Sequence, residues 1–202
     1  MITIVDYDAG NLHSVENALK YLGVETQITS DPEAVARAKK LILPGVGAFG
    51  DAMEQLKSRG LDAALKEAAA GGTPLLGICL GLQVLFERSE ESPGAQGLGI
   101  LKGEIVHIPP ESGLKIPHIG WNSLHLMNDG RLFRGISENT YVYFVHSYYL
   151  RADDERIVKA TTEYGAHIHA SVEQDNVFAC QFHPEKSSAV GRRILQNFVN
   201  LE

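Results

Sequence analysis

A cysteine between two glycines is the residue of this sequence best placed to act as a nucleophile. Cys79 lies in Gly77-Ile78-Cys79-Leu80-Gly81, directly after an apolar run. Where a buried strand turns sharply into a helix, flanking glycines leave room for the turn and the residue between them is exposed. The unpaired N–H groups and the dipole of the helix then favour thiolate over thiol. The alternative is a small buried cysteine at a strand–helix junction.

A histidine and a glutamate that could activate this thiol follow much later in the chain. The segment Phe182-His183-Pro184-Glu185 comes after another apolar run. His183 can accept the thiol proton and later donate it to a leaving amine, while Glu185 can hold the ring in the required tautomer. Because the chain has 8 histidines, a turn histidine with a local hydrogen bond is the alternative for His183. Together the two motifs predict a cysteine amidase with the catalytic residues Cys79, His183 and Glu185.

A glycine-rich turn after a third apolar run can supply backbone donors to such a site. The turn is Pro44-Gly45-Val46-Gly47. With the backbone N–H of Leu80, the backbone of Val46 and Gly47 is expected to form an oxyanion hole. A phosphate-binding loop is the competing interpretation, but the lysine followed by serine or threonine of a P-loop is missing. A simple strand-to-helix turn is the second alternative.

Alternating strands and helices must position these residues. In the first half the expected strands are 2–5, 24–28, 41–43 and 74–78, and the expected helices begin near Leu12, at a capping box over 30–33, near Asp51 with a break at Gly60, and at Leu80. In the second half β-rich segments are expected at 104–108, 122–126, 141–145, 157–162, 167–172 and 177–181, before a closing helix over 190–198. This order predicts an α/β fold in one domain, residues 1–202: an open, mostly parallel sheet flanked by helices, with an antiparallel or mixed β extension.

The composition excludes several other classes of protein. The 202 residues are 44% hydrophobic and 21% charged, and the net charge of −7 argues against nucleic acid or an anionic membrane as the main partner. No apolar run could span a bilayer and no secretion signal opens the chain, so a cytoplasmic protein with Cys79 and Cys180 as free thiols is expected. No metal or cofactor is expected, because no CxxC or HxxxH pairing occurs. His167 and His169 would share one face of a strand as structural or surface residues.

These motifs resemble the class I (triad) glutamine amidotransferases, over essentially the whole chain. The segments Gly77–Gln83 and Phe182–Glu185 carry that resemblance. The finer pattern is similar to one branch of the family, the glutaminase subunits of imidazole glycerol phosphate synthase. It is carried by Asp6-Tyr7, Gly10-Asn11-Leu12, Pro44–Gly47, Pro117–Asn122, His146-Ser147-Tyr148 and Lys186-Ser187.

The resemblance implies a reaction and a partner. Cys79 would attack the side-chain carboxamide of glutamine, and the ammonia would pass to the cyclase subunit, a separate (β/α)8-barrel chain, in a heterodimer. The cyclase makes imidazole glycerol phosphate and aminoimidazole carboxamide ribotide in histidine biosynthesis. The amino-acid end of glutamine would be bound by Gln83, Glu91, Ser147 and Tyr148, and residues near the partner interface would be Asn11, Trp121, Asn122, Tyr143 and Lys186. For Glu91 a solvated charged helix end is the alternative, and for Trp121 a core position.

One departure from the wider family suggests how the site is controlled. Many members carry two adjacent glycines and a proline at the oxyanion turn, whereas this chain has Pro44-Gly45-Val46-Gly47. If the Val46–Gly47 peptide points the wrong way at rest, the oxyanion hole forms only when the partner and its substrate are bound. Two alternatives remain for the function. One is the glutaminase of a pyridoxal phosphate, anthranilate or purine pathway, and the other is a non-catalytic or stress-related α/β protein that reuses the cysteine turn.

Overall fold

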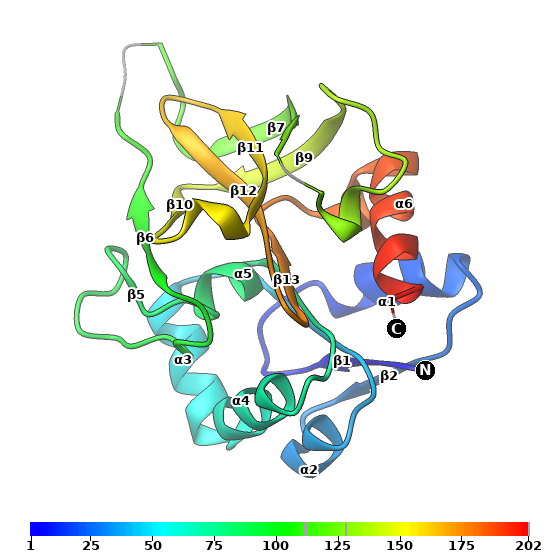
Figure 1. The fold of residues 1–202 in the computed structure, drawn as a ribbon. Helices are drawn as coiled ribbons and strands as arrows, with labels where there is room; N and C mark the ends of the chain where they lie inside the picture. Colours follow the sequence, from blue (N-terminus) through cyan, green and yellow to red (C-terminus); the bar gives the residue numbers. More distant parts are fainter. Residues whose placement is uncertain (111–112, 128, 202) are drawn as a thin grey trace.

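The main sheet of the protein is built from strands of both halves of the chain (Figure 1). The structure, a computed structural model, describes residues 1–110, 113–127 and 129–201, and within them eight strands form this sheet. Their order across the sheet is β2 (Thr26–Thr29), β1 (Ile2–Val5), β3 (Leu41–Gly45), β4 (Leu75–Cys79), β13 (Val177–Cys180), β12 (His167–Gln174), β11 (Val158–Glu163) and β8 (His125–Leu126). The first five are parallel and the last three continue antiparallel. The expected mostly parallel sheet with an antiparallel extension is therefore confirmed.

Helices cover both faces of this sheet (Figure 1). They are α1 (Leu12–Tyr21), α2 (Pro32–Ala36), α3 (Phe49–Ser58), α4 (Leu61–Ala70), α5 (Leu80–Val84) and α6 (Ser188–Val199). The break between α3 and α4 falls at Gly60, which has a left-handed φ of 70°, as its position in the sequence predicted. The expected capping box differs in one detail, because Asp31 rather than Ser30 accepts the hydrogen bond from the Glu33 N–H. Helix α2 therefore begins one residue later, with Pro32 in its first turn.

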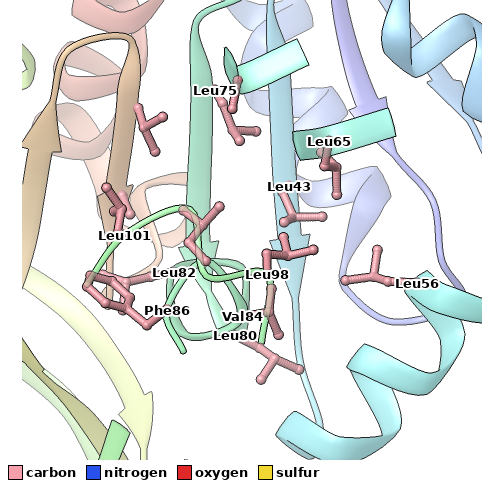
Figure 2. Packing of buried hydrophobic residues seen from close by; sticks show 14 of the residues in the cluster. Leu43, Leu56, Leu65, Leu75, Leu80, Leu82, Val84, Phe86, Leu98 and Leu101 are labelled. Carbon is pink, nitrogen blue, oxygen red and sulfur yellow. The ribbon is translucent and has the colours of Figure 1, made fainter. Parts of the chain in front are cut away.

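Side chains of the central strands alternate between two apolar layers. On β3, Leu41 and Leu43 pack with the layer of α2 to α5, while Ile42 between them packs with α1 and α6. Figure 2 shows the first layer, in which Leu43 lies near Leu65 of α4. Because helices cover both faces of the sheet, the central strands are continuous apolar runs. These runs could therefore be located from the sequence. Among the described residues no helix combines the length and the apolarity needed to cross a membrane.

The β-rich second half forms more than the one extension that the sequence predicted. Two small sheets stand apart from the main sheet: β10 (Tyr148–Ala152) with β6 (Gly103–His107) and β5 (Arg88–Ser89), and β7 (His118–Ser123) paired antiparallel with β9 (Tyr141–His146). Strands β5 and β10 were not predicted. Only Ser147 separates β9 from β10, so no glycine or proline marks the point where the chain passes from one sheet to the other. The segment expected at 122–126 is likewise divided between β7 and β8.

Candidate active site

The cysteine turn has the strained geometry that its glycines predicted. Cys79 is the last residue of β4 and precedes α5, with φ 56° and ψ −109°, outside the usual regions for a residue with a side chain. A Cβ on Gly77 would lie 2.7 Å from the carbonyl oxygen of Gly81, and one on Gly81 would lie 1.8 Å from that of Leu43. Both glycines are therefore required because backbone approaches backbone there. Helix α5 has only five residues, so the electrostatic help that it gives a thiolate comes from its first N–H groups.

His183 and Glu185 lie on a short turn that follows β13. Nδ1 of His183 and Oε1 of Glu185 are 2.7 Å apart, and the two side chains are only 3% and 2% exposed. Burial lowers the pKa of the His183 imidazole, but its interactions with Cys79 and Glu185 outweigh burial and raise the pKa from 6.5 to about 10. Nε2 of His183 has no hydrogen-bond partner among the described residues. The ring can thus hold a proton and offer it at Nε2 to a leaving group beside Cys79.

This turn is locked to its surroundings by backbone and side-chain contacts. The Ser187 hydroxyl donates to the carbonyl of His183 at 2.6 Å and accepts from the N–H of Tyr143 at 3.0 Å. The His183 N–H donates in turn to the carbonyl of Tyr143. Helix α6 packs on the turn so closely that a Cβ on Gly191 would overlap the carbonyl oxygen of Pro184. The predicted base and the predicted orienting acid are consequently held by β9 and α6 together.

The sulfur of Cys79 has two polar neighbours of its own. The Nε2 amide of Gln181 lies 3.7 Å from Sγ, and the carbonyl oxygen of Val145 lies 3.9 Å from it. The Gln181 side chain is fully buried and its Oε1 accepts from Nε2 of Gln83 at 3.2 Å. An amide N–H directed at sulfur stabilises a thiolate more than a thiol, because the donor faces the full negative charge.

One cavity of about 260 Å³ gathers the residues that the sequence singled out. Below the roughly 300–1,000 Å³ of pockets for drug-sized ligands, this volume suits a small metabolite. Glu185 is not on its wall and stands behind His183. The lining residues are Val46, Gly47, Cys79, Leu80, Gln83, Glu91, Pro117, Val145, His146, Ser147, Tyr148 and His183. Every residue predicted for the oxyanion hole or for glutamine binding is among them.

Two predicted binding residues are already oriented by the protein. One carboxylate oxygen of Glu91, Oε2, accepts the N–H of Phe49 at 2.7 Å. Nε2 of Gln83 donates to the carbonyl of Tyr148 at 3.1 Å as well as to Gln181. Glu91 therefore does not stand as a solvated helix end: it is half-buried and ties the start of α3 to the cavity wall. Its second oxygen is left for a ligand cation.

The turn predicted to form the oxyanion hole is the exposed wall of the cavity. Val46 is 45% exposed, and Gly47 has a φ of 104°, which only glycine adopts without strain. Gly45 in contrast is packed from behind, because a Cβ there would overlap the hydroxyl of Tyr7. That hydroxyl is buried and without a hydrogen-bond partner among the described residues. The Gly45 end of the turn is thus fixed by packing, whereas the Val46–Gly47 end is exposed and free to move.

The residues predicted for a partner interface fall into two groups. Trp121, Tyr143 and Lys186 form one cluster, in which Trp121 and Lys186 are exposed and Tyr143 is half-buried: the two rings are 6.2 Å apart, and Nζ of Lys186 lies 5.9 Å from the Tyr143 ring. Trp121 is 52% exposed, so it is not a core residue. Asn11 instead caps α1, accepting from the Ser14 N–H. Asn122 points inward, where it donates to the carbonyl of Glu163 at 3.0 Å.

Four residues that the structure ties to the candidate site by hydrogen bonds were not predicted from the sequence. Gln181 and Ser187 stood beside the triad motif, and His118 and His146 stood inside segments that were quoted only for their resemblance. The only signal for these residues in the sequence is that they lie within or beside the motifs. The spacing of the residues along the sequence does not show which of their side chains are in contact. In the part of the chain that the structure describes, no three His, Cys, Asp or Glu side chains cluster as a metal site. His169 accepts from the N–H of Ala152, a structural contact.

Comparison with known proteins places this geometry in a family. The family described as glutamine amidotransferase class-I matches residues 3–201. The imidazole glycerol phosphate synthase subunit HisH of Moorella thermoacetica is 50% identical over 200 residues, covering 99% of this chain and 94% of that protein. The subunit of the same name from Caldanaerobacter subterraneus subsp. tengcongensis is 51% identical over 198 residues, covering 98% and 97%.

Solved structures agree on the architecture at lower identity. A glutamine amidotransferase crystal structure superposes with a TM-score of 0.77 at 21% identity, covering 98% of this chain and 97% of that one. The structure of PurLQS from Thermotoga maritima also gives a TM-score of 0.77, at 22% identity, with 98% and 97% covered. At this identity the likeness establishes the fold alone.

Proposed function

Because this chain belongs to the class I glutamine amidotransferases, in the branch of imidazole glycerol phosphate synthase subunits, we propose a chemical role for each part of its cavity. The chain is a glutaminase of histidine biosynthesis, which hydrolyses glutamine to glutamate and ammonia. The observation that carries the assignment of the site is the juxtaposition of a strained Cys79 with a buried His183–Glu185 pair on one small cavity.

Cys79 is the nucleophile and His183 handles the proton. The thiol proton passes to Nε2 of His183, where the raised pKa of the imidazole holds it, and Sγ attacks the carboxamide carbon of glutamine. As the C–N bond breaks, the imidazolium returns a proton to the departing ammonia. Water then hydrolyses the thioester to glutamate, with His183 accepting the water proton. Glu185 keeps Nδ1 of the ring protonated and directs Nε2 toward the sulfur.

The oxyanion of the tetrahedral intermediate is held by backbone donors from two turns. The N–H of Leu80 comes from the start of α5 and the second donor from the Val46–Gly47 turn. Gly47 can adopt both positive and negative φ without steric strain, and this allows the peptide between Val46 and Gly47 to rotate. We therefore propose that this donor is aligned when the partner and its nucleotide ligand are bound, which restrains wasteful hydrolysis of glutamine.

The amino-acid end of glutamine is bound on the opposite wall. The free oxygen of Glu91 faces the α-ammonium group, since a carboxylate suits a cation. The donors of Gln83 are both used within the protein, so it offers its carbonyl oxygen. Ser147 and Tyr148, where the chain passes from β9 to β10, present hydroxyl and backbone donors to the α-carboxylate.

Ammonia leaves for a separate cyclase chain. The partner that we propose is the (β/α)8-barrel subunit of imidazole glycerol phosphate synthase, in a cytoplasmic heterodimer in which this chain is a single domain. The exposed apolar side chains of β7 and β9, namely Ile119, Trp121 and Tyr141, support this docking face, since aromatic residues serve as interface anchors. Lys186, beside the ring of Tyr143, adds a positive charge at the edge of this docking face.

The test compares glutaminase turnover with and without the cyclase and its nucleotide ligand. We expect turnover to rise when both are added, and Cys79→Ala to abolish it while retaining affinity for the cyclase. Cys180→Ala is the matched control, because that thiol is fully buried in the core. Equal turnover in the isolated chain and the complex would refute the gating of the oxyanion turn. An active Cys79→Ala chain would refute the catalytic assignment.

A further inference from the structure

A buried row of hydrogen bonds runs from strand β7 to the cavity. Nδ1 of His118 lies 3.1 Å from Nε2 of His146, and Nδ1 of His146 lies 2.9 Å from the carbonyl oxygen of Tyr148. At the other end, Nδ2 of Asn122 lies 3.4 Å from Nε2 of His118. We call His118, His146 and the Tyr148 carbonyl the histidine relay. The roles assigned above use neither His118 nor the ring of His146.

Only one arrangement of protons satisfies the histidine relay. The Tyr148 carbonyl can only accept, so Nδ1 of His146 must carry a proton and its Nε2 must accept. His118 must then donate from Nδ1 and accept at Nε2, where the Asn122 amide supplies a donor. Neutral rings are thereby each fixed in one tautomer. Desolvation by burial supports this state, because it lowers the pKa of His118 to about 4 and of His146 to about 3.

Packing prevents the His118 ring from turning away. It is stacked between the rings of Phe144 and Tyr164, with centroid distances of 4.8 and 3.9 Å and interplanar angles of 20° and 15°. Only 2% of His118 and 6% of His146 is exposed. A displacement of β7 must therefore carry His118 with it and pull on the bond to His146.

The two ends of the histidine relay lie at functionally different places. Strand β7 exposes Ile119 and Trp121 on the proposed partner face, while His118 on the same strand points inward. The Tyr148 carbonyl also accepts from Nε2 of Gln83, whose second bond leads through Gln181 to the sulfur of Cys79. A continuous row of hydrogen bonds thus joins the partner-facing strand to the nucleophile.

We propose that His118 and His146 are positioning residues that couple the partner-facing strand β7 to the glutamine site at Tyr148. Binding of the cyclase fixes β7, β7 fixes His118, and the neutral pair fixes the backbone of Tyr148 that holds substrate and Gln83. This rests on the proposed function, since it requires a partner on β7 and glutamine at Tyr148. It assigns no chemistry to either ring.

Three substitutions at His118 separate this coupling from a merely structural role. His118→Phe keeps a flat ring between Phe144 and Tyr164 but removes the donor to His146. In His118→Asn the side-chain amide nitrogen stands close to the position of Nδ1, so that donor is retained. In His118→Gln the amide reaches the position of Nε2 and the donor to His146 is lost. His125→Phe is the matched control, because His125 is exposed on β8 and its ring lies 3.1 Å from the carboxylate of Glu138, away from His146.

The measurement is the KM for glutamine and the activation ratio, which is turnover with the nucleotide-loaded cyclase divided by turnover of the isolated chain. Coupling between sites is typically worth about 5- to 150-fold. We expect His118→Phe and His118→Gln to lower the activation ratio about 10-fold and to raise KM, with cyclase affinity unchanged. His118→Asn and His125→Phe should keep the parent ratio.

The outcomes distinguish this inference from the proposed function. If the parent complex hydrolyses no glutamine, the proposed function is wrong. If the parent is activated and both His118→Phe and His118→Gln are activated equally, the histidine relay carries no coupling. Thermal unfolding is recorded for each variant, and if His118→Phe does not fold, the comparison of His118→Asn with His118→Gln decides.

Discussion

Replacing Gly191 with alanine tests whether helix α6 positions the catalytic turn. A Cβ at Gly191 would lie 1.8 Å from the carbonyl oxygen of Pro184, whereas real Cβ contacts essentially never fall below 3.0 Å, so the two must separate by at least 1.2 Å. Pro184 stands between His183 and Glu185, which means that this displacement reaches the base directly. A misplacement of about 1 Å can cost roughly 100-fold in rate.

Stability should change far less than activity. Overpacking costs about 1–3 kcal/mol, but alanine is favoured over glycine inside a helix by about 1 kcal/mol. The net loss of about 0–2 kcal/mol corresponds to a drop in Tm of at most about 8 °C for a chain of this size. The expected result is thus a folded Gly191→Ala protein whose glutaminase turnover, assayed in the complex, is reduced about 100-fold.

Gly71→Ala is the matched control, because a Cβ there would meet its nearest atom at 3.3 Å, at the far end of α4. It should retain full turnover. A Gly191→Ala enzyme with more than a tenth of the parent turnover would contradict the claim that α6 holds the His183–Glu185 turn in place. Loss of cooperative unfolding in Gly191→Ala would contradict the estimate of its stability.

The remaining predictions concern stability. Burial lowers the pKa of His118 to about 4, so between pH 6.5 and 4 the ring is protonated in the unfolded chain but not in the folded one. The free energy of unfolding therefore falls as pH falls from 6.5 toward 4, by on the order of 2–3 kcal/mol. Urea unfolding at pH 7.5 and at pH 5 should show this loss in the parent and a smaller loss in His118→Asn. Nζ of Lys40 donates to three carbonyl oxygens at the end of α6, so Lys40→Met should cost about 2–3 kcal/mol in urea unfolding, whereas Lys20→Met, at an exposed ion pair, should cost less than about 1 kcal/mol. Tyr7→Phe removes a buried hydroxyl without a partner among the described residues and should raise the free energy of unfolding by about 1 kcal/mol. A decrease of about 1 kcal/mol in the free energy of unfolding would mean that the hydroxyl is hydrogen-bonded.

The parts that the sequence predicted depend on short-range rules. The turn at Cys79 follows from two glycines that are needed within two residues of it, and the structure shows the backbone atoms that exclude a Cβ there. The central strands could be found because burial on both faces leaves continuous apolar runs. Gly60 ended a helix by its φ alone. In each case the signal in the sequence is local, even where the contact that requires it, such as Gly81 against the carbonyl oxygen of Leu43, comes from another strand.

The parts that were missed depend on long-range pairing. His118 and His146 meet because β7 and β9 pair in one register, and a shift of one residue would turn His118 to the solvent side. The division of the β-rich half into separate sheets has the same origin, since the bend at Ser147 is not marked by any turn residue. The contact of Gln181 with Cys79 likewise needs β13 beside β4. Such contacts are set by the assembled sheet, and local patterns do not contain them.

The active site is divided into a rigid part and an adjustable part, and this division explains where control can act. His183 and Glu185 are almost fully buried and are held by Ser187, so a bound partner cannot easily move them. The proposed oxyanion turn is exposed at Val46 and has a left-handed φ of 104° at Gly47, on the wall of the cavity. Since hydrolysis needs both parts, a partner that orders only the exposed turn can switch the reaction on. The buried pair then needs no rearrangement and keeps its protons in place between turnovers.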